Sequence, residues 1–169
     1  QTQLVQQISA FSQVKKFDIN ELFRTALDGI VGVLGFKRVG LALISKDRKQ
    51  MSARTVVGAP AEFGQIMNLS MDQENLFTHA IRSAQPLWIG AASMAGKAYL
   101  LTSAIKMKTK SQHCLVAPIV VSGKPIGVFY ADTGEGGGAI TDAQYSGFCT
   151  LVLQVSAVLT SVSTVRSTS

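Results

Sequence analysis

Apolar residues recur at helical spacing over the first part of the chain. Leu4, Ile8 and Phe11 are spaced by four and then three residues, which predicts a short helix over residues 4–14. A capping pattern at Asp18–Glu21 then predicts a second helix that runs to about residue 34. The residues expected on its buried face are Leu22, Phe23, Ala26, Leu27, Ile30 and Leu34.

Two glycines lie inside this second predicted helix. Gly29 and Gly32 each weaken a helix by about 1 kcal/mol relative to alanine. We therefore expect another element to approach the helix closely at both positions.

Apolar runs bounded by turn-forming residues predict the strands. They lie at residues 39–44, 51–57, 87–89, 115–121 and 126–131. The first run is apolar on both faces and is typical of a central strand. Ser122–Pro125 is rich in turn formers and predicts a hairpin between the last two strands.

The remaining segments predict two further helices and one loop. A helix is expected over residues 76–84, with its cap within residues 70–73. It is expected to end there because Pro86 follows. Residues 90–112 lack a clear period and predict a long irregular insertion, with a helical turn or two over 99–106. A cap at Thr141 opens the last helix, whose seam is Phe148, Val152, Val155, Leu159 and Val162. The sum is an α+β fold: an antiparallel sheet with helices at the two ends of the chain.

Composition and length favour one folded domain. Hydrophobic residues make up 47% of the 169 residues and charged residues 15%, which is enough apolar material for a core. We expect one domain over residues 1–169 with a core over about 15–160, since single domains usually hold about 100–200 residues. A first residue of Gln rather than Met suggests a fragment of a longer multidomain protein.

Cysteine usage, hydropathy and charge narrow the cellular setting. Cys114 and Cys149 form no paired motif and no secretory segment precedes the first helix, so we expect a cytoplasmic domain. Gly, Ser and Gln interrupt the apolar stretches short of the roughly 20 residues of a membrane span, which predicts no membrane helix. The net charge is +6, and its basic residues cluster around one predicted hairpin, at residues 46–54, and in a central loop, at residues 97–110, with Tyr99 as the one interleaved aromatic residue. This pattern favours a solvated basic face over a nucleic-acid site.

Two phrases in the right order resemble a GAF domain. They are LFTHAIRSAQPL over residues 76–87 and LVAPIVVSGKPIGVFYAD over residues 115–132. The Phe-Tyr-Ala-Asp ending is similar to bacterial GAF-like domains that follow an HDOD domain. The resemblance covers about residues 15–160 and implies a sheet of five or six strands. It also implies terminal helices on one face, often used for dimerisation, and a ligand pocket on the other, roofed by the middle segment.

The resemblance leaves the ligand and cofactor unknown. The Asn-Lys phrase of cyclic-nucleotide binders and the Asp-Ile-Pro phrase and attachment Cys of bilin binders are both missing. The aromatic residues near the implied pocket side are equally explained by core packing, and Arg54 by an exposed sheet surface. The candidate ligand-binding residues are Arg54, Phe77, Trp88, Tyr99, His113, Tyr130 and Asp132.

Candidate catalytic groups are few. Cys114 adjoins His113, but neighbours on a strand point to opposite faces, and a buried Cys is usually a small apolar residue. Cys149 on the last helix has the same interpretation. His79 and His113 lack a third ligand at metal-binding spacing. Gly134–Ala139 matches GxGxxA, but a dinucleotide site needs a parallel βαβ unit, so a flexible connector is expected.

Three functions follow in order. The first is a non-catalytic sensory module that binds a small molecule and relays the event through its terminal helices to a neighbouring domain, with HDOD as one candidate. The second is a dimerisation or scaffold domain without a ligand, and the third a redox enzyme of the free methionine sulfoxide reductase type.

The last predicted helix has more apolar residues than one stripe buries, which predicts a homodimer. Its expected interface residues are Leu4, Ile8, Phe11, Val155, Leu159 and Val162.

Overall fold

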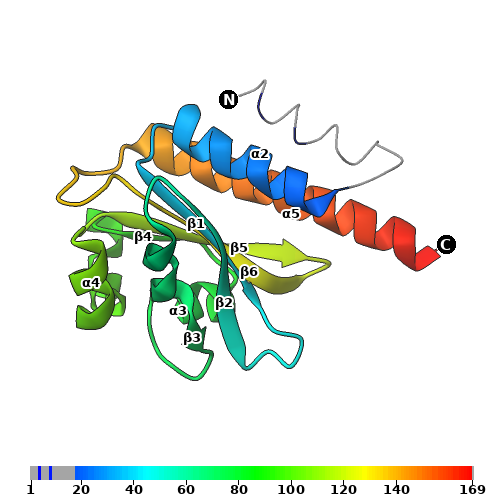
Figure 1. The fold of residues 1–169 in the computed structure, drawn as a ribbon, viewed down its shortest axis with the longest axis horizontal. Helices are drawn as coiled ribbons and strands as arrows, with labels where there is room; N and C mark the ends of the chain where they lie inside the picture. Colours follow the sequence, from blue (N-terminus) through cyan, green and yellow to red (C-terminus); the bar gives the residue numbers. More distant parts are fainter. Residues whose placement is uncertain (1–3, 5–7, 9–17, 169) are drawn as a thin grey trace.

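An antiparallel sheet is the frame of the computed structural model, which describes Leu4, Ile8 and residues 18–168. Its strands are β1 (Arg38–Ile44), β2 (Gln50–Val57), β3 (Leu69–Ser70), β4 (Leu87–Ile89), β5 (Cys114–Val121) and β6 (Lys124–Asp132). They form one six-stranded sheet in the order β3-β2-β1-β6-β5-β4, with each neighbouring pair antiparallel. The predicted α+β fold is confirmed, with β1 at the centre as expected (Figure 1).

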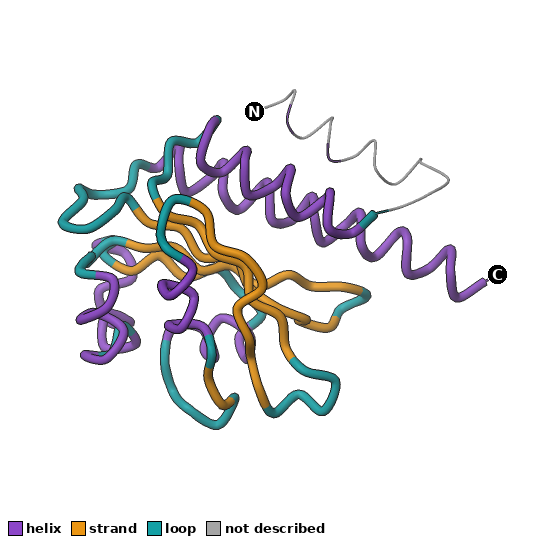
Figure 2. Tube along the Cα trace, viewed as in Figure 1, coloured by secondary structure: helices purple, strands orange, loops and turns teal. Residues whose placement is uncertain are grey.

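Helices cover both faces of the sheet. The long helices α2 (Ile19–Gly32) and α5 (Asp142–Thr168) lie side by side on one face, as the family resemblance implied (Figure 1, Figure 2). Shorter helices cover the other face: η2 (Ala61–Met67), α3 (Leu76–Ser83), η3 (Ala92–Leu100) and α4 (Ser103–Thr109). The sheet therefore separates two apolar cores, because alternate strand residues point to opposite faces.

Local hydrogen bonds explain where the two long helices begin. The Asn20 amide donates to Asp18 Oδ1 over 2.9 Å at the start of α2. At the start of α5 the Gln144 amide donates to Thr141 Oγ1, and the Thr141 amide donates to Gln144 Oε1, each over 3.0 Å. This reciprocal pair is a capping box, and it confirms the predicted start of the last helix.

The predicted buried stripe of α2 is confirmed, but only one of its glycines is closely approached. Leu22, Ile30 and the other residues of the stripe are buried. The side chain of Leu4 lies where a Cβ on Gly29 would be, as expected. Among the described residues, no atom lies within 4 Å of a Cβ placed on Gly32, so they do not make the expected close approach there.

Helix α3 begins later than its predicted cap. Asn75 Oδ1 accepts from the amides of Phe77 and Thr78 over 2.9 and 3.1 Å, and the Asn75 amide donates to Thr78 Oγ1 over 3.1 Å. The expectation of a cap within residues 70–73 is therefore wrong. Thr78 takes the place of the usual Glu or Gln of a capping box, which hid the motif in the sequence.

The segment expected to be irregular is mostly helical. Residues 92–109 form η3 and α4, and residues 61–67 form η2, which the sequence did not predict. A 3₁₀ helix has three residues per turn, so it does not produce the apolar period of an α-helix. The prediction of a long irregular insertion over residues 90–112 is wrong, whereas the helical turn expected over residues 99–106 is confirmed in part, since α4 begins at Ser103.

Helix α5 is long and apolar enough to cross a membrane by length and composition alone. Its stretch Asp142–Ser163 has a mean hydropathy of 1.5, so the expectation that no such stretch exists is wrong. Serine, threonine and glutamine interrupt its apolar runs without lowering the average enough. In this fold Phe148, Val152 and Val155 pack into the core between α5 and the sheet.

Two hydroxyl groups of α5 supply acceptors for β5 beyond the end of β4. Strand β4 pairs only with residues 114–116 of β5. Farther along, the Val120 amide donates to Ser156 Oγ and the Ser122 amide donates to Thr160 Oγ1, each over 3.0 Å. The first bond is partly buried and the second is exposed, and together they join α5 to β5.

Replacing Ser156 with alanine should lower the free energy of unfolding by about 1–3 kcal/mol, because the Val120 amide loses its acceptor in a partly buried setting. Urea denaturation followed by circular dichroism measures the change. Ser161→Ala, an exposed serine on the same helix, is the matched control and should leave the midpoint nearly unchanged. Equal midpoints for the two variants would contradict the assigned bond.

Candidate functional site

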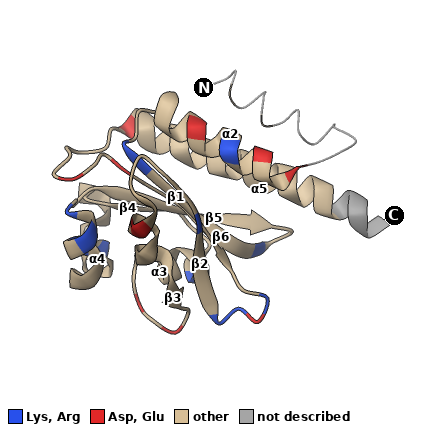
Figure 3. Ribbon diagram, viewed as in Figure 1, with Lys and Arg blue, Asp and Glu red and all other residues tan. Residues whose placement is uncertain are grey.

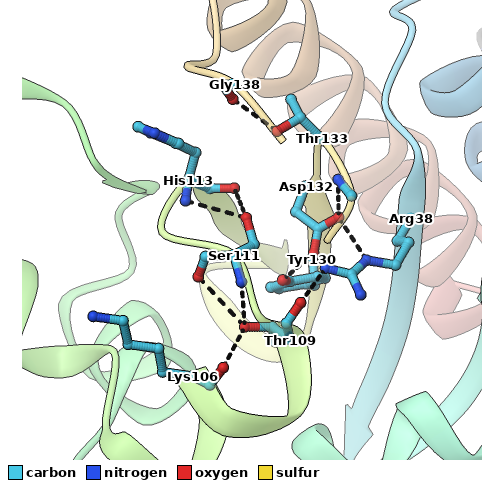
Figure 4. A network of polar contacts seen from close by, with 10 residues as sticks. Arg38, Lys106, Thr109, Ser111, His113, Tyr130, Asp132, Thr133 and Gly138 are labelled. Carbon is cyan, nitrogen blue, oxygen red and sulfur yellow. Dashed lines mark hydrogen bonds and ion pairs between the residues drawn. The ribbon is translucent and has the colours of Figure 1, made fainter. Parts of the chain in front are cut away.

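A buried ion pair lies where β1 begins and β6 ends. Arg38 and Asp132 are partners in the antiparallel register of these strands. The guanidinium Nε donates to Asp132 Oδ1 over 2.9 Å, and Nη2 lies 2.8 Å from Oδ2 (Figure 4). The side chain of Asp132 is fully buried and that of Arg38 is 11% exposed. This two-pronged geometry holds the Arg38 guanidinium in one orientation.

Two more donors complete the surroundings of the Asp132 carboxylate. The Tyr130 hydroxyl donates to Oδ2 over 2.5 Å, and the Gly134 amide donates to Oδ1 over 2.8 Å. Burial first, and then the neighbouring Cys114 and Asp132, raises the pKa of Tyr130 well above its ordinary value. Tyr130 therefore stays protonated and serves as a donor to the carboxylate.

The other contacts of Arg38 reach helix α4 and η2. Nη2 also donates to the carbonyl oxygen of Thr109 over 2.6 Å, at the end of α4 (Figure 4). The guanidinium carbon lies 4.5 Å from the centre of the Phe63 ring, a cation–π contact. The next residue, Lys110, accepts from the Gly136 amide through its carbonyl oxygen over 2.8 Å. The ion pair thus joins β1, β6, α4 and the loop that leads to α5.

A surface cavity of about 810 Å³ opens beside this ion pair. It is bounded by the start of β1, the loop after β2, η2, α4 and the loop after β6. Its lining residues are Lys37, Arg38, Gly58, Ala59, Pro60, Glu62, Phe63, Gln65, Lys108, Thr133, Gly134 and Glu135. The lining combines three cations with two carboxylates and few large apolar groups, so it suits a polar ligand.

Burial affects both cysteines as candidate nucleophiles. Cys114 is 1% exposed, and burial followed by the nearby Asp132 charge raises the pKa of its thiol. Burial also raises the pKa of Cys149. Both thiols are therefore poor nucleophiles, since the thiolate is the reactive form. Among the residues that the structure describes, no group of three His, Cys, Asp or Glu side chains is arranged to hold a metal ion.

Three of the predicted ligand-binding residues lie together: Phe77, Tyr130 and Asp132. Phe77 and Tyr130 are fully buried on the α3 side of the sheet, with ring centroids 5.9 Å apart, and Tyr130 bonds to Asp132. His113 lies at the start of β5, and its Nδ1 is buried without a hydrogen-bond partner among the described residues. As ligand contacts these residues stay predictions, but Phe77 and Tyr130 do fill the core.

The structure separates the other predicted ligand-binding residues. Trp88 lies on the opposite face of the sheet, where its ring stacks on Tyr145 of α5 with centroids 4.8 Å apart. Tyr99 is 63% exposed on η3. Arg54 is exposed on β2 and donates to Asn20 Oδ1 over 2.9 Å. No single site collects these three side chains with Tyr130.

Sequence reasoning missed the basic residues of the cavity. Lys37 precedes β1, Arg38 is its first residue, and Lys108 comes from the segment expected to be irregular. One signal existed: an arginine opens a buried strand while an aspartate closes another. Antiparallel pairing of those strands places the two residues opposite each other, but the sequence alone does not name the pairing.

The predicted dimer seam is largely used within one chain. Val155 and Leu159 are buried in the core beneath α5, and Val162 packs against it half-buried. Leu4 and Ile8 are buried in the same core, and Phe11 lies outside the described residues. Whether any of them also contacts a second copy stays a prediction.

Comparison with known proteins identifies the family. The model of the GAF domain matches residues 18–159, which is most of the chain. The chain belongs to the GAF family. GAF domains are generally regulatory rather than catalytic, and many act as ligand-binding sensors in signalling. No curated protein matches the chain.

Solved structures share this GAF fold. Residues 122 to 287 of a methyl-accepting chemotaxis protein superpose with a TM-score of 0.71 at 26% identity, over 90% of this chain and 94% of that one. A GAF domain/HD domain protein from Geobacter sulfurreducens superposes with a TM-score of 0.69 at 19% identity, over 90% of this chain and 95% of that one. Free methionine-R-sulfoxide reductase from Neisseria meningitidis superposes with a TM-score of 0.67 at 15% identity, over 94% of this chain and 87% of that one. The last two similarities concern the fold alone.

Replacing Asp132 with asparagine should lower the free energy of unfolding by about 3–5 kcal/mol, because it leaves the mostly buried Arg38 charge without its counterion. Chemical denaturation of the variant measures the loss. Glu21→Gln, which removes the carboxylate of an exposed ion pair with Arg24, is the matched control and should change stability little. An Asp132→Asn variant as stable as the wild type would contradict the assigned role of the ion pair.

Proposed function

We propose that this GAF domain is a non-catalytic sensory module that binds a small anionic molecule in the cavity beside Arg38. The observation that carries the proposal is the cavity of about 810 Å³, within the usual size of small-molecule sites. Its floor is held rigid by the Arg38–Asp132 ion pair. A preorganised floor lowers the cost of binding a ligand.

The charges around the cavity favour an anionic group on the ligand. Lys37, Arg38 and Lys108 line it together with two carboxylates, and Glu135 lies 3.7 Å from Lys110 Nζ. No described residue hydrogen-bonds the Nη1 group of Arg38, while Nε and Nη2 have partners. A carboxylate or phosphate reaching Nη1 would gain charge-assisted hydrogen bonds from a guanidinium already in place.

The loop after β6 offers a route from the cavity to α5. Thr133, Gly134 and Glu135 line the cavity, and the chain enters α5 at Asp142. Within the loop the Thr133 hydroxyl donates to the carbonyl oxygen of Gly138 over 2.7 Å. A ligand that binds Lys37 and Lys108 would displace this loop, and the displacement would reach the first turn of α5. We propose this as the relay to a neighbouring domain.

The family's use in signalling supports the same assignment. One structural relative is a methyl-accepting chemotaxis protein, and another is named for a GAF domain joined to an HD domain. We therefore propose that the chain is one cytoplasmic domain of a longer signalling protein, with an HDOD domain as one candidate neighbour.

Removing the cavity lysines should weaken anion binding. We expect the Lys37→Gln, Lys108→Gln double variant to bind about tenfold less tightly than the wild type, because two charge-assisted contacts are lost. The probes are inorganic phosphate, a dicarboxylate and a nucleoside monophosphate, each scored by the rise in melting temperature. Hydrogen exchange over residues 133–138 should slow when a probe binds.

A control and a mass measurement complete this experiment. Lys46→Gln, Lys124→Gln makes the same charge change at exposed lysines that do not line the cavity, and it should bind the probes as the wild type does. Native against denaturing mass spectrometry of freshly purified protein detects a retained molecule. If mass spectrometry detects no retained molecule and no probe raises the melting temperature, the ligand proposal is refuted and a scaffold function is favoured.

A second candidate function is homodimerisation through the outer face of α5. From residue 143 to 163 this helix has no charged residue, and Leu153 is 71% exposed. Ser146, Thr150, Ala157 and Ser161 are exposed at helical spacing around it. We propose that this face, rather than the seam of Val155 and Leu159, meets a second copy across a two-fold axis.

Leu153→Glu should convert the dimer to a monomer, because it places a charge at the centre of the uncharged face. Sedimentation velocity reads the oligomeric state, and the unfolding midpoint should not fall because Leu153 is exposed in the monomer. Val33→Glu, at a residue 53% exposed beyond the end of α2, is the matched control and should stay dimeric. A monomeric wild type at high concentration would rule out this candidate.

A further inference from the structure

The whole net charge of the chain comes from one internal segment. Residues 75–131 contain Arg82, Lys97, Lys106, Lys108, Lys110 and Lys124 and no acidic residue. The chain has 16 basic and 10 acidic residues, so the rest has 10 of each and balances to zero. The charge of +6 is therefore a property of this segment and not of the molecule at large.

Four of these cations are concentrated on one lobe, η3 with α4. Lys97 belongs to η3, Lys106 and Lys108 to α4, and Lys110 is the residue that ends α4. In Figure 3 the ribbon of the α4 lobe has positions coloured as Lys or Arg and none coloured as Asp or Glu. Lys110 pairs with Glu135 over 3.7 Å. Among the described residues, no carboxylate forms an ion pair with Lys97 or Lys106.

Two large apolar side chains are exposed among these lysines. Ile105 and Thr109 are buried one helical turn apart, so they form the inner face of α4. Met107, between them, points away from that face and is 76% exposed. Tyr99 on η3 is 63% exposed. Only a few large apolar residues of the described chain are exposed to this degree, and two of them lie on the cationic lobe.

We infer that the η3–α4 lobe is a docking surface for an acidic protein segment that carries an apolar side chain. Lysines around an exposed methionine and tyrosine match the usual plan of an interface, an apolar centre with a charged rim. The unbranched thioether side chain of methionine adapts to different partner side chains. Lys97 and Lys106, which form no ion pair with a described carboxylate, would attract acidic side chains and speed the encounter.

Other polyanions fit the lobe less well. Residues 97–110 contain no arginine, which is the preferred side chain for binding phosphate by two parallel bonds, and Tyr99 is their one aromatic residue. That composition argues against nucleic acid. Helix α4 has seven residues and one strongly exposed apolar side chain, too little to enter a membrane surface. An acidic protein segment is the occupant that uses both the charge and the exposed apolar groups.

The test uses the whole chain and a fluorescein-labelled peptide in which glutamates flank a central pair of leucines. Fluorescence anisotropy should show saturable binding that weakens as salt is added. The Lys97→Glu, Lys106→Glu variant should bind the peptide about tenfold less tightly, and Met107→Ser about fivefold less. None of these three residues lines the cavity beside Arg38, so failure of the ligand proposal would not affect this result.

Matched variants and competing probes make the test decisive. Lys46→Glu, Lys124→Glu reverses the same charge elsewhere, and Val33→Ser removes an exposed apolar residue beyond the end of α2; both should bind the peptide as the wild type does. Unchanged binding by the Lys97→Glu, Lys106→Glu and Met107→Ser variants would overturn the inference. Binding only to oligouridylate, or only to vesicles of phosphatidylcholine and phosphatidylserine in a three-to-one ratio, would replace it with a nucleic-acid or membrane surface.

Discussion

The Arg38–Asp132 ion pair is the constraint on which the functional end of this domain depends. A buried carboxylate is tolerated only when its oxygens have partners, and Asp132 has them from Arg38, Tyr130 and the Gly134 amide. Arg38 in turn holds the end of α4 through Thr109. One charge pair thus determines where two strands, a helix and a loop meet, and the cavity lies at that junction.

The packing of the sheet explains why the cavity lies at its end. On the α3 side, Phe77 and Tyr130 fill the centre of the sheet face, so little room is left there for a ligand. On the other face, a hydrogen bond from Gln144 Nε2 to the Leu34 carbonyl ties α5 to the turn after α2, and Ser156 ties α5 to β5. Both faces are packed, and the open space lies where strands give way to loops.

Charge is distributed very unevenly over the remaining surface. The outer face of α5 has no charged residue between residues 143 and 163, whereas the η3–α4 lobe has lysines and no acid. Like charges on one lobe repel each other and leave it available for an oppositely charged partner. The cavity beside Arg38 is lined by both signs of charge. The three regions are chemically distinct, and each suits a different type of partner.

The sequence by itself determined the elements whose signals are local. The stripe of α2, the hairpin of β5 and β6 and the cap at Thr141 follow from residues a few positions apart, and the two GAF-like phrases identified the family. The cap at Asn75 and the 3₁₀ helices were missed because their local patterns are weaker. Only the tertiary structure paired Arg38 with Asp132, 94 positions apart, and turned Trp88 toward Tyr145. Such contacts depend on strand order and register, which local periodicity does not specify, and the cavity they frame was therefore invisible in the sequence.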